Sequence, residues 1–270
     1  MKNNQLDPLY APVEKIRMGD LLPEYDHLSG LLYATIVTLP TGEKRIVNYC
    51  SEDYHLVKNH DVIPPLVDEV SRFYNIDTMV KIYGYTRFYV DLIIKNKALE
   101  MTKTDKVYAR IRVANSYDGS KKYNFSMSFW RQICKNGLMG FVNWDSVTKM
   151  HTPGIGEYTD FSKVMEMSSL FLAEMDGHFE RYRELQYQSV ANPLLRIEEV
   201  TEETEFPNSL MEDVVARLQQ ELTINQVSEA NDWLVYNAFN YQLNHNEDYK
   251  AKEERKAKID NQVFQYLMDY

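Results

Sequence analysis

Residues 107–151, VYARIRVANSYDGSKKYNFSMSFWRQICKNGLMGFVNWDSVTKMH, hold the pattern that decides the fold. Apolar residues occupy every second position from Val107 to Val113, and again from Tyr123 to Phe129. A period of two is typical of strands that bury one face. The Asp118-Gly119 pair between the two runs is a strong hairpin signal. After Ser128 the period changes, and we expect a short helix over 130–141 that carries Arg131 and Lys135.

The opposite face of these two strands is rich in basic and polar side chains. Around it the charge is unevenly distributed: residues 81–149 have a net charge of +8, whereas residues 198–248 have −11, in a chain of net charge −10. A local basic segment in an acidic chain favours a nucleic-acid-binding groove. The residues that we expect to line it are Lys81, Arg87, Lys106, Tyr108, Arg110, Arg112, Lys121, Lys122, Arg131 and Lys135.

Outward from this stretch, the same patterns predict a mixed fold. Residues 31–39 and 43–50 predict two strands, residues 61–74 a helix, and residues 78–85 and 87–94 two further strands. Helices are expected over 161–188, 209–222, 229–243 and in the tail. We therefore expect an α+β fold in which an antiparallel sheet of about four to six strands packs on helices.

Three segments divide the chain in this interpretation. Residues 1–190 form the α+β core, which begins with an irregular arm over 1–31. Residues 191–207 contain two prolines and the acidic run EEVTEETE, which is typical of a linker. Residues 208–270 form a helical C-terminal region.

Composition argues against several classes of protein. No run of eighteen apolar residues predicts a membrane-spanning helix, and the first residues lack the apolar core of a signal peptide. Two cysteines, Cys50 and Cys134, suit a reducing cytoplasm. We find no phosphate-binding glycine loop and no pair of histidines at helical metal-ligand spacing, so we expect no cofactor and no metal.

Two short motifs admit a functional and a structural interpretation. Asn115–Ser120 could form a phosphate or metal loop, but a single aspartate in a tight turn favours a turn held by local hydrogen bonds. Cys134 and His151 could suggest a nucleophile and its base, but no orienting acid has a recognisable spacing. A buried cysteine and a hydrogen-bonded histidine are the better interpretation.

Four segments occur in an order that resembles a known family. They are NSYDGS (115–120), RQICKNGL (131–138), His151-Thr152 and WLVYNAFNYQLNH (233–245). Together they resemble the phage- and plasmid-associated family labelled domain of unknown function 932, over roughly residues 25–245. Lys135 departs from the family pattern, which more often has threonine there. The resemblance implies a mobile-element origin, and therefore the cytoplasm of a bacterial host cell.

At the level of the fold, the predicted helix, four strands and helix of residues 61–141 are also similar to single-strand annealing recombinases. That resemblance implies an oligomer that holds single strands along a basic sheet.

The leading hypothesis is a non-catalytic protein that binds and anneals single-stranded DNA in phage or plasmid recombination and replication. Lysine and arginine would contact phosphates, and tyrosine or tryptophan would stack on bases. We expect a homo-oligomer, with a basic protein partner at the acidic C-terminal region.

Two alternatives remain. A protein-interaction module of a mobile element, such as an acidic inhibitor of a host defence system, would present a continuous acidic face. A nucleic-acid enzyme would need carboxylates from Asp91, Asp105, Asp118 or Asp145, which have no motif spacing.

Overall fold

The computed structural model describes residues 8–24, 32–102, 105–132, 136–138, 147–152 and 161–269. The chain has the mixed α+β fold that the sequence predicts, with antiparallel sheets and a helical C-terminal region. It divides into two compact units. The first unit comprises residues 1–93, 111–127 and 144–170, and the second comprises residues 94–110, 128–143 and 171–270.

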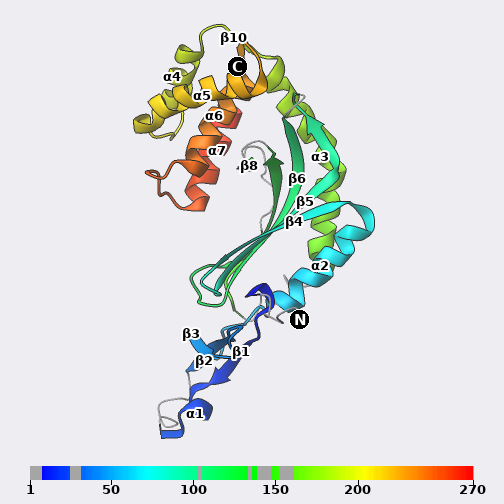
Figure 1. Cartoon of the computed structure of the whole chain (residues 1–270), viewed down its shortest axis with the longest axis vertical. Coiled ribbons are helices and arrows are strands. Elements are labelled where there is room, and N and C mark those ends of the chain that lie inside the picture. Colours follow the sequence, from blue (N-terminus) through cyan, green and yellow to red (C-terminus); the bar gives the residue numbers. More distant parts are fainter. Residues whose placement is uncertain are drawn as a thin grey trace. The chain divides into compact units, whose positions relative to one another are not determined.

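A small antiparallel sheet belongs to the first unit (Figure 1). Its strands are β1 (Val13–Arg17), β2 (Tyr33–Thr38) and β3 (Lys44–Cys50). The strands predicted over 31–39 and 43–50 are β2 and β3, and Gly42 supplies the positive φ of 84° that the turn between them needs. The prediction of an irregular arm over 1–31 is wrong for residues 8–24, the part that the structure describes. That part forms η1 (Pro8–Tyr10), strand β1 and the short helix α1 (Met18–Leu21).

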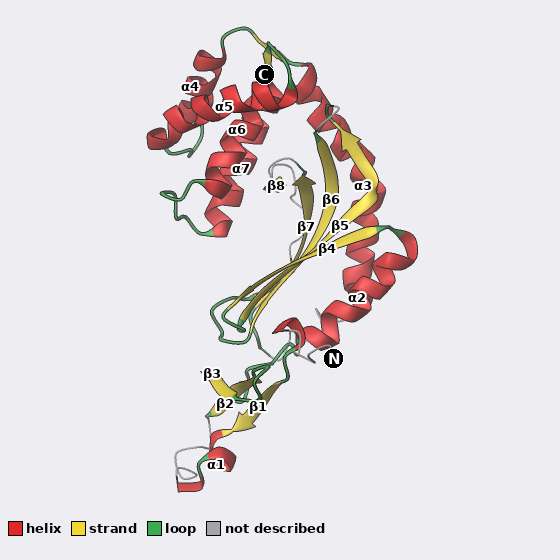
Figure 2. Ribbon diagram, in the orientation of Figure 1, coloured by secondary structure: helices red, strands yellow, loops and turns green. Residues whose placement is uncertain are grey.

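The large sheet has the strand order β4-β5-β6-β7-β8, and β9 also pairs with β7. Figure 2 shows its long, curved strands. Its elements are β4 (Ile76–Tyr83), β5 (Arg87–Glu100), β6 (Lys106–Ser116), β7 (Tyr123–Arg131), β8 (Asn136–Leu138) and β9 (Val147–Lys149). Helix α2 (Asn59–Phe73) precedes it and buries Ile63, Leu66 and Val70. The strands predicted around 78–94 and 107–129 are thus confirmed.

The short helix expected over 130–141 is wrong where the structure describes it. Strand β7 continues to Arg131, and β8 pairs with it antiparallel, with Phe129 opposite Leu138. Arg131 keeps the register of β7 and points to the same side as Phe129, because side chains two apart share a face. Its positive charge interrupts the apolar alternation, which is why the sequence suggested a change of period.

The second unit gathers most of the C-terminal helices, and Figure 1 shows α4 to α7 lying together. The elements are α3 (Phe161–Tyr187), which begins in the first unit, then β10 (Ser189–Val190), α4 (Pro193–Glu203), η4 (Asn208–Leu210), α5 (Met211–Asn225), β11 (Ala230–Asn231), α6 (Asp232–His245) and α7 (Glu253–Met268). Tyr182, Trp233, Tyr236 and Phe264 form a fully buried aromatic cluster among α3, α6 and α7. Helix α6 is buried over most of its length, from Asp232 to Asn240 and at Gln242 and Leu243.

The segment expected to be a linker contains helix α4. Asn192 caps it, since its side chain accepts a hydrogen bond from the Leu195 N–H, and Pro193 begins it. Ile197 and Val200 are fully buried. The acidic side chains that suggested a linker instead occupy the outer side of an amphipathic helix, as the exposed Glu198 and Glu202 show.

Candidate nucleic-acid interface

Two hairpin turns meet at one end of the large sheet, in the first unit. Gly84 and Tyr85, in the turn between β4 and β5, have positive φ angles of 63° and 62°, and Gly119 has a φ of 69°, as tight hairpin turns require. The Thr86 carbonyl accepts a hydrogen bond of 2.7 Å from the Tyr117 N–H. The two turns are therefore tied together, which places the β4–β5 and β6–β7 loops side by side.

A row of tyrosines and arginines lies on the polar face of the sheet near these turns. The rings of Tyr83 and Tyr89 meet edge to face with centroids 5.9 Å apart. The guanidinium of Arg87 lies 5.9 Å from the Tyr83 ring, and that of Arg112 lies 5.8 Å from the Tyr89 ring. Tyr83 is 50% exposed. We call Tyr83, Arg87, Tyr89 and Arg112 the tyrosine–arginine row.

The two arginines of the row differ in availability. Both Nε and Nη2 of Arg112 donate to the Asp91 carboxylate, at 2.6 and 2.7 Å, so its charge is already matched. Arg87 is exposed, and its Nε lies 3.9 Å from an Asp118 oxygen, beyond hydrogen-bonding distance. Arg87 is therefore the cation of the row that faces solvent, and Arg112 holds Tyr89 in place.

Asp118 organises the neighbouring turn. Its carboxylate accepts hydrogen bonds from the Ser120 N–H at 2.9 Å and from the Thr86 hydroxyl at 2.8 Å. Burial alone would raise the pKa of Asp118, but these hydrogen bonds and the Arg87 charge outweigh burial and lower it. The turn interpretation of residues 115–120 is thus supported.

Further cations lie beside this turn. Lys122 is exposed and Lys121 is half-buried, and neither forms an ion pair with a described acidic residue. The hairpin end therefore presents more positive than negative charge.

The candidates of the second unit lie deeper. Arg110 is 3% exposed, and its Nε donates to the Ser128 hydroxyl at 2.8 Å. Tyr108 is 6% exposed, and the Lys95 ammonium lies 4.1 Å from its ring centroid. Lys106 pairs with Glu100. The expectation that Tyr108 and Arg110 lie on a solvent-facing side is wrong, because both sides of β6 are buried here.

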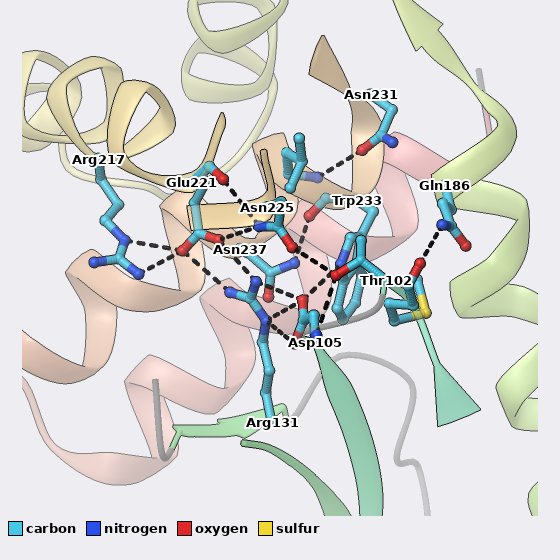
Figure 3. A network of polar contacts seen from close by, with 12 residues as sticks. Thr102, Asp105, Arg131, Gln186, Arg217, Glu221, Asn225, Asn231, Trp233 and Asn237 are labelled. Carbon is cyan, nitrogen blue, oxygen red and sulfur yellow. Dashed lines mark hydrogen bonds and ion pairs between the residues drawn. The ribbon is translucent and has the colours of Figure 1, made fainter. Parts of the chain in front are cut away.

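Arg131 is the centre of a buried polar network in the second unit (Figure 3). Its guanidinium donates to the carboxylates of Asp105, at 2.6 to 3.0 Å, and Glu221, at 2.7 and 3.1 Å. Trp233 Nε1 donates to Asp105 at 3.2 Å, and Arg217 pairs with Glu221 from the other side. The segments that begin at Arg131 and at Trp233, two of the four quoted above, therefore meet in the core.

The electrostatics of this network favour its charged form. Burial opposes the charge on Arg131, but the nearby carboxylates of Asp105 and Glu221 outweigh it and raise the pKa of the guanidinium. Burial likewise opposes the charge on Glu221, but hydrogen bonds and charges from Arg131 and Arg217 lower the pKa of that carboxyl. Arg131 is thus a structural cation and not a surface contact for phosphate.

The remaining chemical candidates also have structural partners. His151 is 7% exposed, its Nδ1 lies 3.0 Å from the His55 carbonyl oxygen, and its ring stacks on Tyr54. Burial lowers the pKa of His151. This supports the hydrogen-bonded interpretation of that histidine. Cys50 is a free thiol, and Cys134 lies outside the described residues.

The carboxylates considered for an enzyme are dispersed. Asp91 pairs with Arg112, Asp118 holds the turn beside Arg87, and Asp105 belongs to the buried network of the second unit, whereas Asp145 lies outside the described part of the chain. No group of three potential metal ligands forms among the described residues. Within the same residues, no helix combines the length and apolar character needed to cross a bilayer.

The structure thus divides the ten predicted residues. Lys81, Arg87, Lys121 and Lys122 lie at the surface of the first unit, Arg112 and Lys106 are paired, Tyr108, Arg110 and Arg131 are buried, and Lys135 lies outside the described residues. Sequence reasoning missed Tyr83 and Tyr89. Their alternation with Lys81, Arg87 and Asp91 along β4 and β5 was the signal that could have found them.

Comparison with known proteins finds one family. The model of the family described as Domain of unknown function (DUF932) matches residues 47–263, which span all four segments noted in the sequence. No curated protein and no solved structure matches the chain.

Proposed function

We infer a function for this chain, which belongs to the family described as Domain of unknown function (DUF932), from its own side chains, because that description states no activity. We propose a non-catalytic protein that binds single-stranded DNA and anneals complementary strands, as in phage or plasmid recombination and replication. The binding surface is the tyrosine–arginine row together with Lys121 and Lys122. This surface is smaller than the groove expected from the sequence.

The observation that carries the proposal is the juxtaposition of Tyr83 and Arg87 on an open sheet face, 5.9 Å apart and both exposed. An exposed aromatic ring offers a stacking surface to any base, since every base has a flat face. An adjacent cation compensates the phosphate that follows that base. Aromatic side chains on a sheet surface are a recurring way to bind unpaired strands.

The preference for single strands follows from the same geometry. Stacking on Tyr83 requires a base whose face is accessible, and a duplex covers base faces with neighbouring pairs. The lysines beside the row contact phosphates of either form. We therefore expect duplex DNA to bind more weakly, through the cations Arg87, Lys121 and Lys122 and without stacking on Tyr83.

The test is fluorescence anisotropy with a labelled single strand of mixed sequence over a salt series. Binding should weaken with salt, with a log–log slope of about −0.7 per phosphate contacted. Arg87→Ala combined with Lys122→Ala should make the slope shallower by about 1.4. Tyr83→Ala should weaken binding by about 1–3 kcal/mol without changing the slope, because it removes stacking and no charge.

Lys250→Ala is the matched control, since Lys250 is an exposed lysine of the second unit. Circular dichroism establishes that each variant is folded. Absence of binding at low salt, or equal loss in the control and in the row variants, would refute the proposal. If the wild type binds single strands but does not anneal complementary strands, the proposed function is restricted to binding.

The expected basic partner of the acidic C-terminal region stays a prediction. Glu221 and Asp232 are buried in ion pairs with Arg131 and Arg196 respectively. Only the other acidic side chains of that region could contact a partner.

A further inference from the structure

Strand β4 forms the edge of the large sheet. It pairs with β5 on one side, and no other described strand pairs with it on the other. Its side chains are half-buried or exposed along its whole length, and Val80 and Tyr83 are 43% and 50% exposed. An edge strand of eight residues presents backbone N–H and C=O groups to which another strand can add.

The sequence of this edge, IDTMVKIY, is complementary to itself when read antiparallel. With Met79 opposite Met79 of a second copy, Asp77 lies opposite Lys81, and Lys81 lies opposite Asp77. Directly opposed side chains of antiparallel strands lie close together, so each pair brings unlike charges into contact. A register shifted by two residues in either direction would place Asp77 opposite Tyr83 or opposite Met79, so both ion pairs would be lost.

The apolar side chains fit the same register. Ile76 lies opposite Ile82, and Thr78 lies opposite Val80, on the face of the strand that does not carry the charges. β-branched pairs of this kind pack well across two strands. A lysine on an edge strand ordinarily discourages pairing. In this register Lys81 meets a carboxylate, so it selects one alignment and does not block association.

We propose that two copies of the chain associate through β4, antiparallel and with the two-fold axis at Met79, to form one continuous sheet. A two-fold axis perpendicular to the sheet keeps equivalent faces on the same side. Both tyrosine–arginine rows then face the same side of the joined sheet. Lys81 becomes an interface residue and not a phosphate contact. This inference stands on the edge strand and does not require DNA binding.

The test is sedimentation equilibrium of the full chain over a wide concentration range, in the absence of DNA. The wild type should form a dimer. In the Lys81→Asp dimer, each of the two pairs between positions 77 and 81 consists of two carboxylates. In the Asp77→Lys dimer, each of these pairs consists of two ammonium groups. Either substitution should weaken the dimer on the order of tenfold or more, since attraction becomes repulsion in two pairs.

The double variant Asp77→Lys/Lys81→Asp restores unlike charges and should restore the dimer. Recovery by the swap separates a lost ion pair from a misfolded chain. Arg183→Asp, an exposed change on α3, is the control and should leave the dimer intact. In addition, Met79→Cys should form an intermolecular disulfide on oxidation, whereas Thr78→Cys should not.

A wild type that is monomeric at every concentration would overturn the proposal. So would a dimer that neither single charge reversal weakens, because its interface would lie elsewhere. A wild type that forms the dimer but does not bind single-stranded DNA would refute only the proposed function.

Discussion

Arg131 lies where β7 would otherwise bury one more apolar side chain. It is 1% exposed and lies between two carboxylates that are fully buried, so the charges are removed from water together. A buried ion-pair network of this kind stabilises a fold little more than apolar side chains of the same volume in all its positions would. Removal of one member is costly, because the partners then remain buried without compensation.

Arg131→Met should therefore lower the free energy of unfolding by about 3–5 kcal/mol. Urea unfolding followed by circular dichroism measures it. Arg183→Ala, which breaks only an exposed pair with Glu180 on α3, should change stability by less than about 0.5 kcal/mol. Equal effects of the two substitutions would show that the buried network does not stabilise the fold.

His151 makes stability depend on pH. Because burial lowers its pKa in the folded state, the unfolded chain takes up the proton more readily. Its contribution is therefore complete above the unfolded pKa of about 6.5 and is lost as the pH falls from there through the lowered folded value. The His178 pKa is also lowered by burial, which adds to the same loss.

We expect His151→Gln to reduce the drop in unfolding free energy between about pH 7.5 and about pH 5.5, a window that spans the unfolded pKa. His178 should account for part of the drop that remains. His60→Gln is the control, because the His60 side chain is 79% exposed. An unchanged pH dependence in His151→Gln would contradict the assignment.

At the scale of elements, helix α6 depends on its first turn. Asn231 accepts a hydrogen bond of 3.0 Å from the Leu234 N–H, which caps the helix. This hydrogen bond is partly buried, so it satisfies a backbone N–H of the first turn that has no partner within the helix.

Asn231→Ala should cost about 1 kcal/mol of unfolding free energy, the usual value for loss of a cap, and Asn231→Ser should restore most of it. Chemical denaturation of the three proteins measures this. Asn208→Ala, an exposed asparagine that begins η4, provides the control. If serine fails to rescue, the asparagine acts in another way, for example through its pairing with Ser189.

At the scale of the whole molecule, the second unit joins residues that are far apart in sequence. Arg131 and Glu221 are 90 residues apart, and Asp105 and Trp233 are 128 apart. The helices after residue 190 therefore supply partners for side chains of the sheet. The division into a core over 1–190 and a separate helical region remains a prediction, and these contacts argue against independent folding of the two pieces.

A chain that ends at residue 190 should accordingly fail to fold cooperatively, because Asp105 and Arg131 lose Glu221 and Trp233. Thermal unfolding followed by circular dichroism, with the full chain as reference, measures this. A cooperative transition in the shortened chain would show that the helices are dispensable for the sheet.

The sequence by itself determined the local elements. Alternation along β5 to β7, the turn at Gly119, and the helical periods of α3, α5 and α6 were all predicted, because a strand, a turn or a helix depends mainly on residues a few positions apart. Arg87 and Lys122, the exposed cations of the candidate surface, were among the predicted residues for the same reason, whereas the exposed Tyr83 was missed.

Only the tertiary structure decided which charges are buried. Arg110 and Arg131 have the same local pattern as surface cations, and their partners Ser128 and Glu221 lie 18 and 90 residues away. Helix α4 likewise depends on the burial of Ile197 and Val200, whereas the acidic residues around them suggested a linker. The physical reason is that a charge is stable in the core only when a distant segment supplies its partner, and the local sequence pattern does not show which distant residue that is.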